Sequence, residues 1–148
     1  MKIIRSCKVS LKFATDAKRR ALKNFLKLYG EAVNFFIDRF WENPISKAKL
    51  LKDEVNSFPS PRLSARAKKV AAREALDMIL GAKRSAEETG LPLVKPIHYG
   101  KTMSCSSTLA SLIHASNAKH FDAWLHLMSL GTTEDGESII LDLPIKFH

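Results

Sequence analysis

The segment TDAKRRALKNFLKLYGEAVNFFIDRFW, residues 15–41, carries the strongest periodic pattern in the chain. Its apolar residues recur at steps of three and four, so at roughly 3.6 residues per turn they share one helical face. They are Leu22, Phe25, Leu26, Tyr29, Val33, Phe36, Ile37 and Phe40. The pattern predicts one long helix with a buried face, capped by Thr15 and ended before Pro44.

The same predicted helix carries basic residues on its flank. Arg19, Arg20, Lys23 and Lys27 lie about a quarter turn from the apolar centre when roughly 100° is counted per residue. One element is therefore expected to carry both a core and a display of positive charge.

Composition places the chain among folded soluble proteins. It has 148 residues, of which 45% are hydrophobic and 26% charged, which fits one domain or two closely packed subdomains. No apolar run approaches the roughly 20 residues of a membrane span, and MKIIRSCKVSLKF does not read as a signal peptide. A cytoplasmic location is expected, with Cys7 and Cys105 as buried reduced thiols.

Positive charge is concentrated in the first part of the chain. The formal net charge is +9, and residues 1–86 hold 20 Lys and Arg against 8 Asp and Glu, whereas residues 87–148 hold 4 against 7. A basic but idle surface is one interpretation of this imbalance. A nucleic-acid partner is the other, and the asymmetry favours it.

A second long helix is predicted from the cap Ser64 to about Ser85, after a short helical piece at 46–55 and a proline turn at 58–61. Small residues such as Ala67, Ala71 and Ala75 line its core face. A basic stripe on the other side would span roughly 16 Å at 1.5 Å per residue. It consists of Arg62, Arg66, Lys69 and Arg73. The stripe fits either a solvated face or a phosphate-binding one, and its self-repulsion favours a bound polyanion.

Strands are predicted at both ends of the chain. Residues 7–13 alternate between apolar and polar, and short apolar segments follow at 102–107, 108–114, 121–130 and 138–147. Segment 121–130 also fits a helix. The turn at 134–136 favours a hairpin. The fold class is therefore expected to be α+β, with the first strand joining an antiparallel C-terminal sheet and the helices inserted between them.

Three stretches resemble one protein family. IIRSCKVSLKF (3–13), LSARAKKVAAREAL (63–76) and HFDAWLHLMSLG with DGESIILDLPIKFH (120–131 and 135–148) are similar to the N-terminal part of TnpB-type transposon-encoded RNA-guided nucleases and related miniature type V CRISPR effectors. The resemblance covers essentially the whole chain. It implies a small antiparallel wedge-like β-barrel from residues 1–13 and 97–148, interrupted by a helical recognition lobe at 14–96.

The resemblance also indicates the partner. In that family the two parts grip guide RNA and the guide–target duplex, so guide-type RNA is the predicted partner and target DNA a second candidate. The predicted nucleic-acid contacts in the wedge are Lys8, Tyr99 and Lys101. Those on the two helices are Arg19, Arg20, Lys23, Lys27, Arg62, Arg66, Lys69 and Arg73. Of these, Tyr99 is a candidate for stacking on a base. If the two basic helix surfaces line one groove, they would grip the nucleic acid together.

The family's catalytic parts have no counterpart in these 148 residues. The acidic residues of a RuvC-like domain and the paired CxxC motifs of a zinc ribbon are missing, and Asp142 is expected to be an outward strand residue. No nucleotide-binding glycine loop occurs either. The chain alone is therefore expected to be no enzyme and to need no cofactor or metal.

Several functions remain open besides a non-catalytic RNA-binding module. The chain is alternatively a subunit of a split nuclease whose RuvC domain lies on another chain, or a stand-alone regulator or inhibitor that captures guide RNA. From a different class, it is a helical protein-interaction module whose charge serves solubility.

Overall fold

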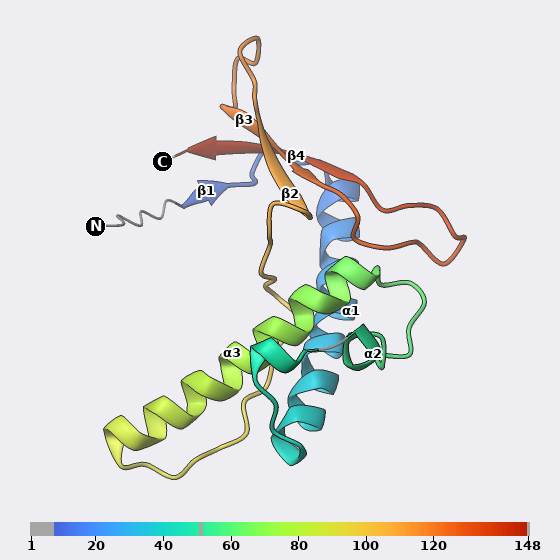
Figure 1. Ribbon diagram of the computed structural model, residues 1–148. Coiled ribbons are helices and arrows are strands. Elements are labelled where there is room, and N and C mark those ends of the chain that lie inside the picture. The colour runs from blue at the N-terminus through green and yellow to red at the C-terminus, as the bar shows by residue number, and fades with distance from the viewer. Residues whose placement is uncertain (1–7, 51, 148) are drawn as a thin grey trace.

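The computed structural model describes residues 8–50 and 52–147, which form an α+β fold (Figure 1). In chain order the elements are β1 (Val9–Ser10), α1 (Asp16–Glu42), a 3₁₀ turn (Lys47–Lys49), α2 (Lys52–Val55), α3 (Ala65–Thr89), β2 (Ala110–His114), β3 (Ala123–Leu127) and β4 (Leu141–Phe147). The helices lie between the first strand and the other three, so the predicted α+β class is confirmed.

Helix α1 is the long helix that the sequence predicts. The Thr15 hydroxyl accepts a hydrogen bond from the Lys18 N–H at 3.3 Å, which satisfies one of the free donors of the first turn. The helix ends at Glu42, two residues before Pro44. Its buried residues are Phe25, Tyr29, Gly30, Ala32, Val33, Phe36, Ile37 and Phe40.

Helix α3 packs on this buried face with small side chains. Ala67, Ala71 and Ala75 are fully buried, which allows a close approach of the two helix backbones. Ser64 caps the helix by accepting the Ala67 N–H at 3.0 Å. The helix continues past the predicted end at Ser85 to Thr89, because Gly90, with φ 69°, is the first residue that breaks it.

The strands form one antiparallel sheet in the order β1-β4-β3-β2. Val9 pairs with Phe147 and Ser10 with Lys146, so the beginning and the end of the described chain meet in one sheet, as predicted (Figure 1). Segment 121–130 contains a strand, β3, and not a helix. Among the described residues the sheet is open, with β1 and β2 at its edges, and it does not close into a barrel.

Other strand predictions are correct only in part. In segment 7–13 the strand is limited to Val9–Ser10, since the chain turns at Ala14, whose N–H donates to the Leu11 carbonyl at 2.9 Å. Cys7 lies outside the described residues. Segment 102–107 contains no strand. The strand predicted at 138–147 begins at Leu141.

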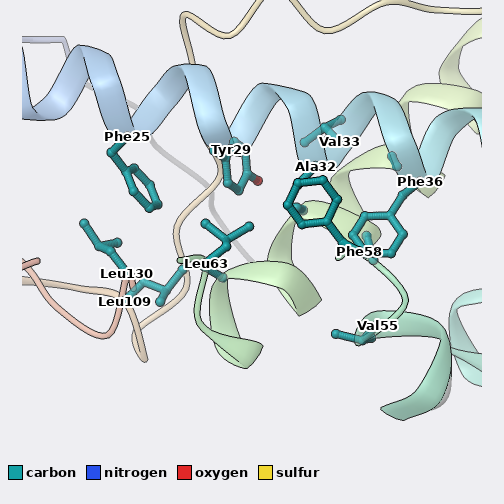
Figure 2. Close-up of a cluster of buried hydrophobic side chains, with 14 of the residues drawn as sticks. Phe25, Tyr29, Ala32, Val33, Phe36, Val55, Phe58, Leu63, Leu109 and Leu130 are labelled. Carbon is teal, nitrogen blue, oxygen red and sulfur yellow. The ribbon is translucent and has the colours of Figure 1, made fainter. Parts of the chain in front are cut away.

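Helices and sheet share one hydrophobic core. Figure 2 shows Phe25 and Tyr29 of α1 facing Leu63, Leu109 and Leu130, which flank α3 and the strands. Farther along α1 the core continues through Phe36 to Phe58 and Val55. The division into residues 1–13 with 97–148 and residues 14–96 stays a prediction.

Candidate nucleic-acid interface

The segment that follows α3, residues 91–101, returns along α1, and we call it the strap (Figure 1). Lys95 Nζ lies 2.7 Å from Asp38 Oδ1. Nearer the start of α1, the Asn34 side chain donates to the His98 carbonyl and accepts the His98 N–H, both at 2.8 Å. The strap therefore runs antiparallel to α1 and is attached to it at two places.

The strap touches α1 most closely at a pair of glycines. A Cβ atom at Gly30 would lie 2.6 Å from the Gly100 Cα, which is closer than packed atoms can come. Gly100 itself has φ 68°, a conformation that favours glycine. The sequence indicates only that Gly30 costs the helix about 1 kcal/mol. The structure gives the reason for it, because no other residue permits this contact.

A buried polar network joins the strap to α3 and to Tyr29 of α1. His98 is 7% exposed, and its Nδ1 accepts the Gly100 N–H at 3.0 Å. The neutral ring therefore carries its proton on Nε2, which lies 3.5 Å from Glu74 Oε1. Glu74 of α3 also accepts the Tyr29 hydroxyl and, at 3.2 Å, the Ser104 N–H. Burial, followed by the contact with Glu74, raises the pKa of Tyr29 far above its usual range. The network is a positioning device between α1, α3 and the strap.

Positive side chains on the first half of α1 lead up to the point where the strap packs on this helix beside Lys27. We call this surface the strap face and define it as Arg20, Lys23, Lys27, Tyr99 and Lys101, all exposed. Among the described residues none of its four cations lies within ion-pair distance of a carboxylate. A Cβ atom at Gly100 would lie 3.4 Å from the Lys27 Cα, so its chain neighbours Tyr99 and Lys101 emerge beside this turn of α1.

The sequence places Tyr99 and Lys101 with the strands, whereas the structure packs their backbone against α1. This grouping could not be read from spacing, because the strap carries no helical or strand periodicity. Lys8 is exposed immediately before β1, at the sheet.

Arg19 differs from its neighbours on α1. Its guanidinium donates to the Lys12 carbonyl at 2.6 Å and lies 3.6 Å from Asp16. It braces the turn between β1 and α1. Arg19 also lines a hollow of about 320 Å³ with Asp16, Arg20 and Lys23, so it borders the strap face without belonging to its unpaired cations.

The predicted stripe on α3 is shorter than expected. Arg62 lies before the helix, and its guanidinium sits 3.6 Å from Glu134 of the loop that joins β3 to β4. The side chain is therefore directed to that loop and not to the stripe. Asp77, one turn beyond Arg73, pairs with Lys47.

Three exposed basic residues remain on α3, and we call them the α3 stripe: Arg66, Lys69 and Arg73. Arg66 reaches toward the sheet, with Nη1 3.4 Å from the Ser129 Oγ. It also lines a hollow of about 540 Å³ beside the β3–β4 loop. Lys69 and Arg73 are in no ion pair with a described residue.

The strap face and the α3 stripe point in opposite directions. At about 100° per residue, the basic residues of each surface lie between roughly a quarter turn and half a turn from the centre of the buried face of their own helix, so most of those on α1 are farther from it than the quarter turn expected from the sequence. The two buried faces pack on one another, so the basic surfaces lie on the outer sides of the helix pair. They do not line one groove, contrary to the hypothesis drawn from the sequence.

Two further sequence predictions concern single residues. Cys105 is exposed, so the prediction of a buried thiol is wrong for it. Asp142 is an exposed residue of β4, as predicted, with its carboxylate 2.5 Å from His126 Nδ1. Where the chain is described, no three His, Cys, Asp or Glu residues gather closely enough to hold a metal ion. None of the described helices is long and apolar enough to cross a membrane.

Comparison with known proteins gives no relative. No family model, no curated protein and no solved structure matches this chain. The resemblance to TnpB-type nucleases therefore stays a prediction from the sequence.

Proposed function

We propose that this chain is a non-catalytic RNA-binding module that holds RNA on its strap face. The observation that supports the proposal is a row of exposed cations on α1, Arg20, Lys23 and Lys27, which ends where Gly100 packs beside Lys27 and the strap presents Tyr99 and Lys101. None of these four cations has a carboxylate partner among the described residues. Surfaces with clustered, unneutralised Lys and Arg are typical of proteins that bind nucleic-acid backbones.

The spacing of the cations suits a phosphate backbone. Arg20, Lys23 and Lys27 follow one another along about 10 Å of α1 at 1.5 Å per residue. Like charges at these spacings repel each other in the free protein. A bound polyanion removes this repulsion and releases its own condensed counterions, which favours binding at low salt.

The resemblance to the TnpB-type family selects the class of RNA within this proposal. It favours a structured guide-type RNA, and a guide–target heteroduplex as a second ligand, read by A-form shape and backbone contacts. A wedge-like role for the sheet and a cytoplasmic location belong to the same proposal. A separate RuvC-bearing chain, or action as a stand-alone regulator, are alternatives that RNA binding alone leaves open.

The proposal is tested by two variants that each lose two positive charges, one on the strap face and the other on α3. Lys23→Ala/Lys27→Ala removes two positive charges from the strap face, and Lys69→Ala/Arg73→Ala removes two from exposed positions of α3. The affinity of each variant for a labelled RNA hairpin with a single-stranded tail is measured over a series of salt concentrations. The strap-face variant is expected to bind more weakly, with a salt slope about 2 lower in magnitude, while the α3 variant keeps a slope near that of wild type.

Three results would overturn the proposal. An unchanged slope in the strap-face variant would make its lysines ordinary solvated residues. An equal loss in both variants would mean that only net charge matters. A larger loss in the α3 variant would place the RNA on the opposite side of the molecule.

A further inference from the structure

We infer that Tyr99 is a stacking platform for an unpaired base, so that the strap face takes a single-stranded stretch of RNA in preference to an uninterrupted duplex. This inference rests on the proposed function and names the form of nucleic acid that the same surface takes.

Tyr99 is unusually open to solvent for an aromatic residue. Its relative exposure is 81%, higher than that of any other exposed large apolar residue of the described chain. Its neighbour His98 is 7% exposed, whereas Ile97 is 60% exposed, so Ile97 and Tyr99 share the outward side of the strap. The ring stacks on no other aromatic ring of the described residues. Both faces of the phenol are therefore free for a planar ligand.

The backbone that carries this exposed ring is held in place on both sides. Before it, the main chain of His98 makes two hydrogen bonds of 2.8 Å to the Asn34 side chain. After it, Gly100 packs against Gly30 and donates its N–H to His98 Nδ1. Only the two side-chain torsions of Tyr99 remain to be ordered, so stacking costs little conformational entropy.

The surroundings of the ring select a nucleotide among planar ligands. Lys101 follows two residues later, and the Lys27 turn lies directly beneath the strap. A base on the ring would thus have positive charge within reach of the phosphates on either side of it. In a duplex the bases are already stacked and paired, so a duplex can use the lysines but not the ring.

The experiment compares two RNA probes of equal length: a single-stranded oligouridylate of about 12 nucleotides and a mixed-sequence duplex of about 12 base pairs. Each is titrated into wild type, Tyr99→Ala, Tyr99→Trp and Lys23→Ala/Lys27→Ala. We expect Tyr99→Ala to weaken binding of the oligouridylate by about 5- to 150-fold, which is roughly 1 to 3 kcal/mol at 1.4 kcal/mol per tenfold. Binding of the duplex and the salt slope stay unchanged, and Tyr99→Trp keeps the affinity for the single strand.

The two lysine substitutions separate this inference from the proposed function. If they weaken both probes while Tyr99→Ala weakens neither, the stacking inference is overturned and RNA binding by the strap face stands. Equal weakening of both probes by Tyr99→Ala would also overturn it. If wild type binds neither probe, both proposals fail. Because the ring is exposed, all Tyr99 variants should unfold at the wild-type temperature, which a thermal melt checks.

Discussion

Gly30 destabilises helix α1 locally, but it allows the strap to pack against this helix. Within α1 it costs about 1 kcal/mol relative to alanine, because glycine loses more backbone entropy on folding. A larger residue does not fit at this position, because its Cβ atom would lie 2.6 Å from the Cα of Gly100 in the strap. The position of Tyr99 and Lys101 on α1 therefore depends on a missing methyl group.

Gly30→Ala is expected to destabilise the protein in spite of the better helix propensity of alanine. The new methyl group meets backbone, which cannot rotate away as a side chain could, so the strap must shift. Gly81→Ala in α3 is the matched control, since nothing lies within 4 Å of its Cβ position and it should stabilise by up to about 1 kcal/mol. Urea unfolding of the two variants measures both effects. A gain in stability for Gly30→Ala similar to that for Gly81→Ala would contradict the described contact.

Several residues that build the site carry no signal in the sequence. Asn34 and His98 are 64 positions apart, and Tyr29 and Glu74 are 45 apart. Each looks like an ordinary helix or loop residue until the tertiary structure brings it to its partner. Arg62 shows the opposite error, because helical spacing put it in a stripe whose helix begins only at Ala65.

At the scale of elements, local chemistry predicts the helices better than the strands. The caps Thr15 and Ser64 and the apolar periodicity of α1 are short-range signals, and they locate both long helices. Segment 102–107 has the composition of a strand, but the Ser104 N–H is bound by Glu74 of α3 and not by a neighbouring strand. A strand needs a partner that local composition does not reveal.

Asp122, the residue before β3, adds further bonds to the antiparallel backbone pairing that joins β4 to β3. The Asp122 N–H donates to the Ile145 carbonyl at 2.9 Å, and its carboxylate accepts the Phe147 N–H at 2.8 Å and lies 3.1 Å from Lys146 Nζ. The hydrogen bond from Phe147, followed by the contacts with Lys146, lowers the pKa of Asp122 below its usual 3.8. Because β4 also pairs with β1, this carboxylate supports the junction of both chain ends.

Asp122→Asn is expected to destabilise the fold at neutral pH. A group whose pKa is lower in the folded state stabilises the fold above its unfolded pKa and loses this effect as the pH falls through the folded value. The difference in unfolding free energy between wild type and variant should therefore be constant above pH 3.8 or so and shrink below it. Denaturant titrations at a series of pH values measure it.

The control is Asp135, which is exposed in the β3–β4 loop. It makes no hydrogen bond or ion pair with any described residue. Asp135→Asn should leave the stability near that of wild type at each pH. A difference for Asp122→Asn that does not change with pH would show that its carboxylate charge contributes nothing.

At the scale of the whole molecule, the helices form an insertion into a sheet that is built from both chain ends (Figure 1). The sequence predicts this arrangement, because an isolated first strand requires a partner farther along the chain. It does not predict an open sheet, since closure depends on strand curvature and edge pairing, which periodicity does not encode.

The directions of the two basic surfaces also emerge only in the whole molecule. Charge counts show that the first 86 residues are basic, and helix periodicity assigns that charge to particular faces. Which way those faces point depends on how α1 and α3 pack. Because the helices bury their apolar faces against one another, the strap face and the α3 stripe lie on opposite sides. A single straight ligand can therefore use one of them. Both surfaces carry cations that pair with no described carboxylate, and the exposed ring of Tyr99 favours the strap face.

The most direct test of RNA binding by the strap face is a lysine footprint of the unmodified chain. Acetylation of each lysine is quantified by mass spectrometry, with and without an RNA hairpin that carries a single-stranded tail. Lys23, Lys27 and Lys101 should lose reactivity when RNA binds, while Lys69 and Lys83, exposed on α3, stay as reactive as in the free protein. Protection of Lys69 with unchanged reactivity at Lys23, Lys27 and Lys101 would contradict the assignment of RNA to the strap face.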